Sequence, residues 1–147
     1  MTVTIAKSTI FENVHRNFYD LITAISGFST IVYAEYPSKV LDAKGDYPVI
    51  IVNPANLSWD TFTFGKNMLE GTVDIDIYTN TPKETDEKSS NINIAIEEGK
   101  TDLADVGLRQ VRLDSTTNDV VLQGKIKVHI RTLTFAFKFY FDKTFAF

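Results

Sequence analysis

Residues 119–142 alternate polar and apolar side chains almost throughout, which is the period of a β-strand with one buried face. From 120 to 130 the apolar residues stand mostly at even positions, whereas from 133 to 141 they stand at odd positions. Because a strand cannot change its buried face without an extra residue, the pattern predicts a β-bulge or sharp bend near residues 131–133. At about 3.3 Å per residue the stretch would reach roughly 70 Å. We therefore expect it to break into two strands or to reach a neighbouring subunit.

The length of 147 residues predicts one domain, 1–147, which is long enough to bury a core without disulfides or metals. The chain contains no cysteine, so thiolate chemistry is excluded. A net charge of −4 without a basic tail argues against a dedicated nucleic-acid binder. The first residues lack the pattern of a signal peptide, and the longest aliphatic run, 49–52, is too short to cross a bilayer. We expect a soluble protein with no membrane partner.

The first candidate helix covers residues 9–26. Thr9 and Glu12 have the form of a capping box at its start, and Gly27 stands where a helix commonly stops. The apolar residues recur at spacings of three and four, which places them on one helix face. They are Ile10, Phe11, Val14, Phe18, Leu21, Ile22 and Ile25.

The second candidate helix covers residues 82–105. Thr81 is a favourable N-cap residue, and Pro82 fits the first helical position. We expect the helix to be loosened at Gly99 and to stop before Gly107.

The remaining segments have the composition of strands and turns. Residues 55–70 are ambiguous between a ragged strand and a long hairpin arm. The predicted strands are 28–36, 47–52, 71–79 and 108–113, with a turn at 115–118 before the long alternating stretch. This order has no regular βαβ alternation, so it predicts an α+β fold: an antiparallel or mixed sheet with two helices packed on one face and a long C-terminal β segment.

Motifs for catalysis are scarce. The glycines never cluster into a phosphate-binding loop, and neither His15 nor His129 has the spacing of a metal ligand. Asp74 and Asp76 would lie about 7 Å apart on one strand face. No third carboxylate stands near them in sequence, so we interpret the pair as a solvated or salt-bridged strand face. We expect no catalytic residue, no metal and no cofactor.

A row of basic residues without an intervening acid lies on the alternating stretch. The row consists of Lys125, Lys127, His129 and Arg131. It suits a solvated edge that discourages aggregation, a wall facing DNA, or a row that pairs with Asp74 and Asp76 across strands or subunits. Like charges on one strand face repel, which favours a partner of opposite sign. On the last interpretation, Asp74, Asp76, Lys125, Lys127 and Arg131 belong to a subunit interface.

Phenylalanine is concentrated at the end of the sequence, where six of the eleven lie between 135 and 147. A small sheet with two helices is a poor candidate to bury all of them. Since an exposed apolar patch usually marks an interface, we expect Phe145 and Phe147 to take part in self-association or docking rather than in core packing alone.

The layout of these segments resembles that of the tail-terminator proteins of long-tailed bacteriophages, which are also called tail-completion or neck-ring proteins. An N-terminal helix is followed by the strand YPVIIV and a long arm. The segment GTVDIDIYTNTPKETDEKSSNI then joins a strand to a capped helix, and VVLQGKIKVHIRTLTFAFKFYF closes the chain. The resemblance covers nearly the whole sequence, by pattern.

The resemblance implies a structural virion protein that assembles with itself into a closed ring, commonly a hexamer. Such a ring caps the tail tube, stops tube polymerisation and meets the head-side connector or neck protein. DNA passes through the lumen without sequence-specific binding. An acidic lumen would let DNA slide, and Glu97, Glu98 and Asp102 are the candidates for its lining. The implied location is the tail or neck of the virion, after assembly in the host cytoplasm.

The sequence leaves two alternatives open. One is another neck, head-closure or tail-joining component of the same virion. The other is a small cytoplasmic ligand-binding α+β domain that uses the aromatic surface as its pocket. An enzyme is the least favoured class.

Overall fold

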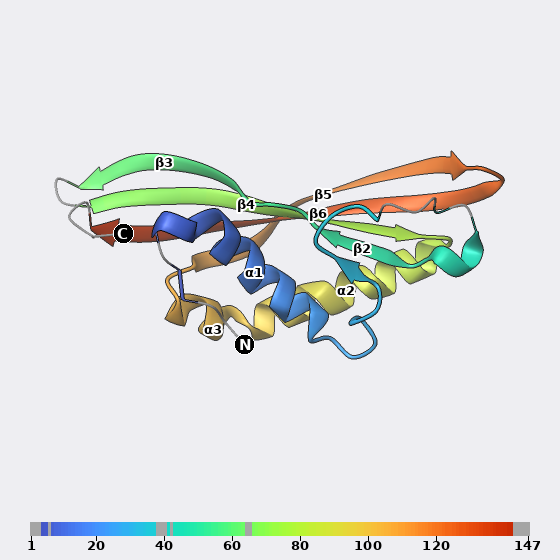
Figure 1. The fold of residues 1–147 in the computed structure, drawn as a ribbon, viewed down its shortest axis with the longest axis horizontal. Helices are drawn as coiled ribbons and strands as arrows, with labels where there is room; N and C mark the ends of the chain where they lie inside the picture. Colours follow the sequence, from blue (N-terminus) through green and yellow to red (C-terminus); the bar gives the residue numbers. More distant parts are fainter. Residues whose placement is uncertain (1–3, 6, 38–40, 42, 64–65, 143–147) are drawn as a thin grey trace.

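The computed structural model describes residues 4–5, 7–37, 41, 43–63 and 66–142, with the backbone alone at 7, 59–63, 66–68 and 140–142. Figure 1 shows a long twisted sheet with the helices on one of its faces. In chain order the elements are a 3-10 turn (Lys7–Thr9), α1 (Ile10–Thr23), β1 (Val32–Tyr33), a second 3-10 turn (Lys44–Asp46), β2 (Val49–Val52), β3 (Asn56–Thr63), β4 (Lys66–Thr79), α2 (Pro82–Glu98), α3 (Lys100–Asp105), β5 (Arg109–Gln123) and β6 (Ile126–Asp142).

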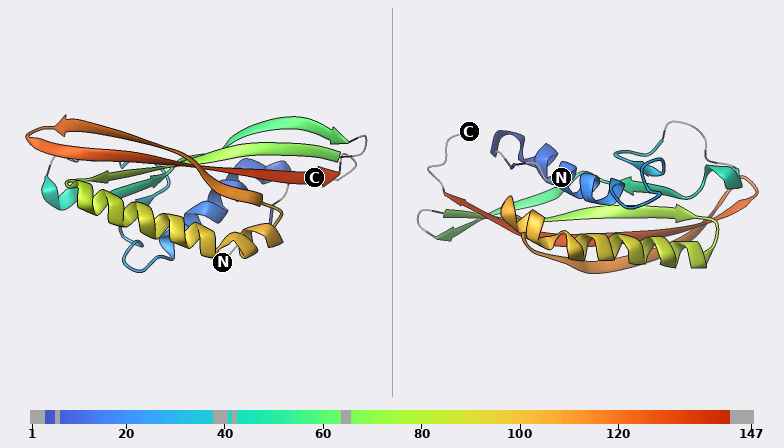
Figure 2. Two further views of the ribbon diagram at one scale, coloured as in Figure 1. Left: turned by 180° about the vertical axis from the view of Figure 1, so that it is seen from behind. Right: turned by 90° about the horizontal axis from the view of Figure 1, so that it is seen from below.

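The six strands form one mixed sheet in the order β1-β2-β4-β6-β5, and β3 pairs with β4 beyond the end of β2. All pairs are antiparallel except β1 with β2. At one end β3, β4 and β6 extend past the helices, and at the other end the β5–β6 hairpin projects (Figure 2). The predicted α+β class, with two long helices on one face, is confirmed.

The long alternating stretch divides at Gly124, which adopts a φ of +68° in the turn between β5 and β6. Residues 119–123 therefore belong to β5 rather than to the last strand. The turn predicted at 115–118 is wrong, because these residues pair with β6 from Thr134 to Arg131. Two of the four are threonines, whose branched side chains suit an extended backbone.

The bulge predicted in β6 near residues 131–133 is also wrong. The pairing of β6 with β4 runs without a register shift from Lys66–Asp142 to Thr79–His129. The irregularities lie in β5 instead, between Arg109 and Arg112 and between Leu113 and Ser115. The strand that carries the change of apolar phase is thus regular, and the edge strand beside it bends.

The apolar phase of β6 changes because its two halves are covered on different faces. Leu133 and Phe135 are buried on the face that carries the helices. Val128 is 1% exposed and lies on the opposite face, as its even position in an uninterrupted strand requires. There Ile130 is paired with Tyr78, which packs against a second apolar cluster. The change of phase in the sequence therefore reports a change of covering layer rather than a bulge.

The first helix is shorter than expected, and it begins without the predicted capping box. It ends at Thr23 instead of 26, and the following turn contains Gly27 with a φ of +83°. Its N-cap Thr9 makes no capping bond to the backbone; its hydroxyl donates to the side chain of Asn13, 2.7 Å away. The strand predicted at 28–36 is reduced to Val32–Tyr33.

The second helix follows the prediction closely. Thr81 caps α2, because its side-chain oxygen accepts a hydrogen bond of 3.2 Å from the backbone N–H of Glu84. The expected loosening at Gly99 is a break that separates α2 from α3. Gly107 has a φ of +99° directly after the helical segment. The ambiguous segment 55–70 supplies β3 and the start of β4, so it is a hairpin arm.

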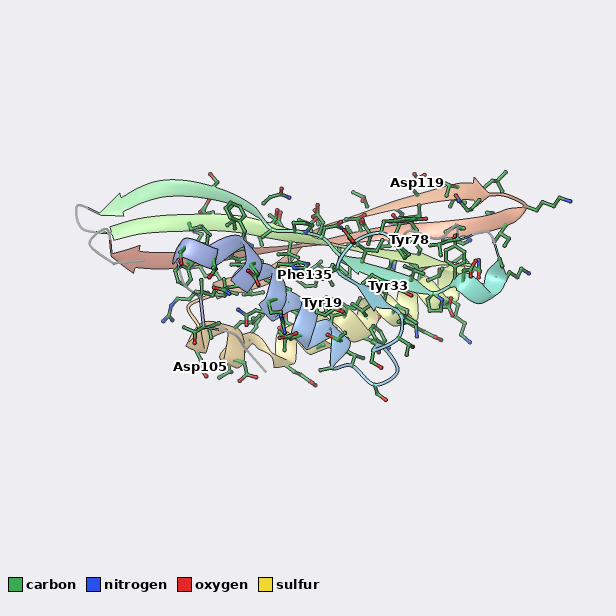
Figure 3. The ribbon with its side chains drawn as sticks, viewed as in Figure 1. Tyr19, Tyr33, Tyr78, Asp105, Asp119 and Phe135 are labelled. Atoms are coloured by element: carbon green, nitrogen blue, oxygen red, sulfur yellow. The ribbon has the colours of Figure 1, made fainter. Side chains whose placement is uncertain are left out.

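The main core lies between the sheet and the helices. Phe18 of α1 is fully buried, with its ring centroid 6.4 Å from that of Phe135 and 5.8 Å from that of Phe137. Figure 3 places Phe135 between the sheet and α1. From β4, Val73, Ile75 and Ile77 enter the same cluster, as their alternation predicts.

A second, smaller core covers part of the opposite sheet face. Its members come from β2, from the segment before it and from neighbouring tyrosines. They are Leu41, Val49 and Ile51, with Tyr33, Tyr47 and Tyr78 packed against them. Strand β2 is consequently buried on both faces, which confirms the prediction for its aliphatic run.

Tyr78 should make the stability of this second core sensitive to alkaline pH. Burial, and next the nearby Asp76 carboxylate, raise the pKa of the Tyr78 hydroxyl to about 12. Because tyrosine in the unfolded chain releases its proton near pH 10, the free energy of unfolding should fall as the pH rises from about 10 towards 12. The variant Tyr78→Phe should lack the part of this fall that comes from the Tyr78 hydroxyl. Urea unfolding of the unaltered protein and of Tyr78→Phe, at intervals between about pH 10 and pH 12, measures this loss. If the free energy of unfolding fell equally with pH in the two proteins, Tyr78 would not be its source.

Candidate subunit interface

The two strand carboxylates lie on the sheet face opposite the helices and are held by neutral donors. The hydroxyl of Thr134 donates to Asp74 over 2.7 Å, and the hydroxyl of Thr132 donates to Asp76 over 2.5 Å. The Asn53 side-chain amide also donates to Asp76, over 3.0 Å. These hydrogen bonds satisfy the carboxylates within the chain without a cation. Within the described ranges there is no group of three or more side chains that could together hold a metal ion.

The basic row divides into two parts. Arg131 points to the helix side, where its guanidinium donates to Asp86 of α2 over 2.8 Å and to the Asn118 side chain over 2.7 Å. Lys125 and Lys127 lie at the hairpin end, are exposed, and form no ion pair with any residue that the structure describes. Among the described residues, the basic row therefore does not pair with Asp74 and Asp76 inside one chain. Pairing between subunits stays a prediction.

The two histidines lie on different elements, His15 on α1 and His129 on β6. The Nε2 atom of His15 lies 2.7 Å from the carbonyl oxygen of Val52, so this side chain joins α1 to β2 at the edge of the core. His129 is half-buried on β6, opposite Val120 of β5.

An exposed apolar group at the end of the β5–β6 hairpin is missed by sequence reasoning. Val120 is 50% exposed, Val121 36% and Leu122 76%. Alternation alone assigns Val120 and Leu122 to a buried face. The signal that identifies them is their distance of a few residues from the Gly124 turn, because side chains at the end of a projecting hairpin have no covering layer. Phe145 and Phe147 lie outside the described residues.

The three acidic residues considered for a lumen lie at the junction of α2 and α3. Glu97 forms an ion pair of 2.9 Å with Lys100. Glu98 and Asp102 border a surface groove of about 410 Å³ between α1 and α2, and their placement at a lumen stays a prediction. The other residues that line this groove are Leu21, Ala24, Ile25, Asn91, Ile94, Ala95 and Gly99.

The outer edge of β5 is also open. Across the described part of the chain, no strand pairs with β5 on the side away from β6. All of its residues from Arg112 to Leu122 are exposed. An edge strand of 15 residues is a ready template for pairing with another chain, so natural proteins usually cover or charge it.

Comparison with known proteins identifies the fold. No protein-family model matches the sequence, and no curated protein sequence matches it either. Among solved structures, a chain from a structure described as the virion of a native gene transfer agent (GTA) particle matches with a TM-score of 0.50 and 13% sequence identity. The match covers 87% of this protein and 95% of that chain. The two chains share a fold over nearly their full lengths. No described helix has both the length and the apolarity needed to cross a membrane.

Proposed function

We propose that this protein is a structural component of a virion, and specifically a ring-forming tail terminator. The observation that carries the proposal is the fold shared, over almost the whole of both chains, with a chain of the GTA virion structure. In this role the ring, commonly a hexamer, caps the tail tube and stops its polymerisation. It then joins the tube to the connector on the head side, and DNA passes through its lumen.

The surface of the protein supports self-assembly. The open edge of β5 runs along the sheet to the β5–β6 hairpin, whose apolar end projects at one end of an elongated molecule (Figure 1). A ring requires a heterologous contact, in which two different surfaces of the subunit meet and the rotation between copies closes. An exposed strand edge and an exposed apolar hairpin provide one of these surfaces.

The proposal predicts closed assemblies of a single size and an effect on tube growth. Sedimentation velocity and electron microscopy should show rings with a central hole, formed by the protein alone or on tube ends. Added to polymerising tail-tube protein of the same phage, the protein should shorten the tubes and sit at one end of each. Tube protein alone is the control. Unchanged tube lengths with rings present would indicate another neck component, and a monomer that neither forms rings nor binds tubes would contradict the virion role.

A further inference from the structure

The β5–β6 hairpin presents an apolar side chain and a cation together. Leu122 is paired in register with Lys127 across the hairpin, so the two side chains point to the same face. Leu122 is 76% exposed, which is the largest exposed fraction among the exposed large apolar residues, and Lys125 stands in the adjoining turn. We call residues 120–127 the hairpin tip. A projecting Leu side chain beside two exposed lysines is complementary to a partner that offers an apolar recess with acidic residues beside it.

A recess of this kind exists on the helical layer of the same molecule. The groove between α1 and α2 has apolar walls from Leu21 and Ile25 on one side and Ile94 on the other. Ile94 is 53% exposed although it stands in a helix that packs on the core. Glu98 and Asp102 border the groove, and within the described ranges neither forms an ion pair. The volume of about 410 Å³ is ample for one aliphatic side chain and its neighbours.

The two surfaces cannot meet within one molecule. The hairpin tip lies beyond the N-terminal end of α2, whereas the groove runs along the C-terminal half of that helix (Figures 1 and 2). At 1.5 Å per residue, the 17 residues of α2 span about 25 Å. Figure 3 shows the same separation, since Asp119 of the hairpin and Asp105 of α3 lie towards opposite ends.

We infer that the hairpin tip of one copy docks in the α1–α2 groove of a second copy. Leu122 enters the groove against Ile94 and Ile25, and Lys125 and Lys127 lie beside Glu98 and Asp102 of the receiving copy. The contact is heterologous because the tip and the groove are different surfaces, so repetition forms a ring when the rotation closes. The inference rests on the ring proposed above and names its subunit contact. It also assigns Glu98 and Asp102 to that contact rather than to the lumen.

Engineered disulfides test the contact directly, since the chain has no cysteine of its own. The double variant Leu122→Cys/Ile94→Cys should give a ladder of covalent oligomers under mild oxidation. Either single variant should give no more than a dimer. The matched control is Leu122→Cys/Gly45→Cys, because Gly45 is exposed with open space around it and lies outside the groove. It should not give the ladder.

Charge reversal tests the proposed complementarity. Lys125→Glu/Lys127→Glu should weaken self-association by roughly tenfold or more, because like charges then face each other across the contact. Glu98→Lys/Asp102→Lys should do the same, and the variant with all four changes should recover association. All four positions are exposed, so circular dichroism should show that every variant folds.

The outcomes separate the contact from the ring. A ladder together with recovery in the fourfold variant supports docking of the hairpin tip in the groove. Rings of the unaltered chain without a 122–94 disulfide, or without recovery, would overturn this contact and leave the proposed ring intact. A chain that stays monomeric at all concentrations and does not assemble on tube ends would contradict both the contact and the ring.

Discussion

Replacing Phe18 by alanine should lower the free energy of unfolding by about 3–5 kcal/mol, because it removes a whole aromatic ring from the centre of the core. Phe18 is fully buried, and its ring packs against those of Phe135 and Phe137. These contacts join α1 to β6, so the change leaves a cavity between the two layers of the fold. Aromatic pairs add roughly 0.5–1.5 kcal/mol to the area term, which favours the upper part of this range.

Urea unfolding followed by circular dichroism measures this change, with Phe11→Ala as its matched control. Phe11 lies on the same helix but is 56% exposed. Its truncation should therefore alter the free energy of unfolding by less than about 1 kcal/mol. Equal losses in the two variants would show that α1 does not pack on the sheet as described.

Gly107→Ala should destabilise the protein by about 2–4 kcal/mol, for two reasons that add. The residue has a φ of +99°, a conformation that is strained for every residue with a Cβ. A Cβ at this position would also stand 2.3 Å from a ring carbon of Phe139. The ring would have to move, and it packs against the main core.

Two other glycines separate the backbone effect from the contact. Gly27 has a φ of +83°, and a Cβ added there would meet nothing within 4 Å, so Gly27→Ala should show the conformational effect alone, about 1–2 kcal/mol. Gly45 has neither a positive φ nor a close neighbour, and Gly45→Ala should be nearly neutral. Thermal unfolding of the three variants should rank them in this order. A loss for Gly107→Ala no larger than that for Gly27→Ala would mean that Phe139 moves without resistance.

The candidate interface shows which of its features can be predicted from local sequence and which cannot. The pattern around Asp74 and Asp76 correctly places both carboxylates on one sheet face, because side chains alternate along a strand. It does not reveal that Thr132 and Thr134 donate to them, since this depends on the register between β4 and β6. The basic row likewise looks uniform in sequence, yet Arg131 binds Asp86 of α2 while the two lysines remain at the hairpin tip.

Local signals in the chain are enough to specify the capped helix α2 with its break at Gly99, the buried strand β2 and the alternation along β4. Capping, glycine conformation and side-chain period act within a few residues, so no distant contact is needed to read them. Long-range packing sets where β5 ends, which face of β6 each layer covers and which apolar residues stay exposed. Those outcomes depend on strand register and on the placement of helices and loops from distant parts of the chain, and alternation has the same period whichever face is covered.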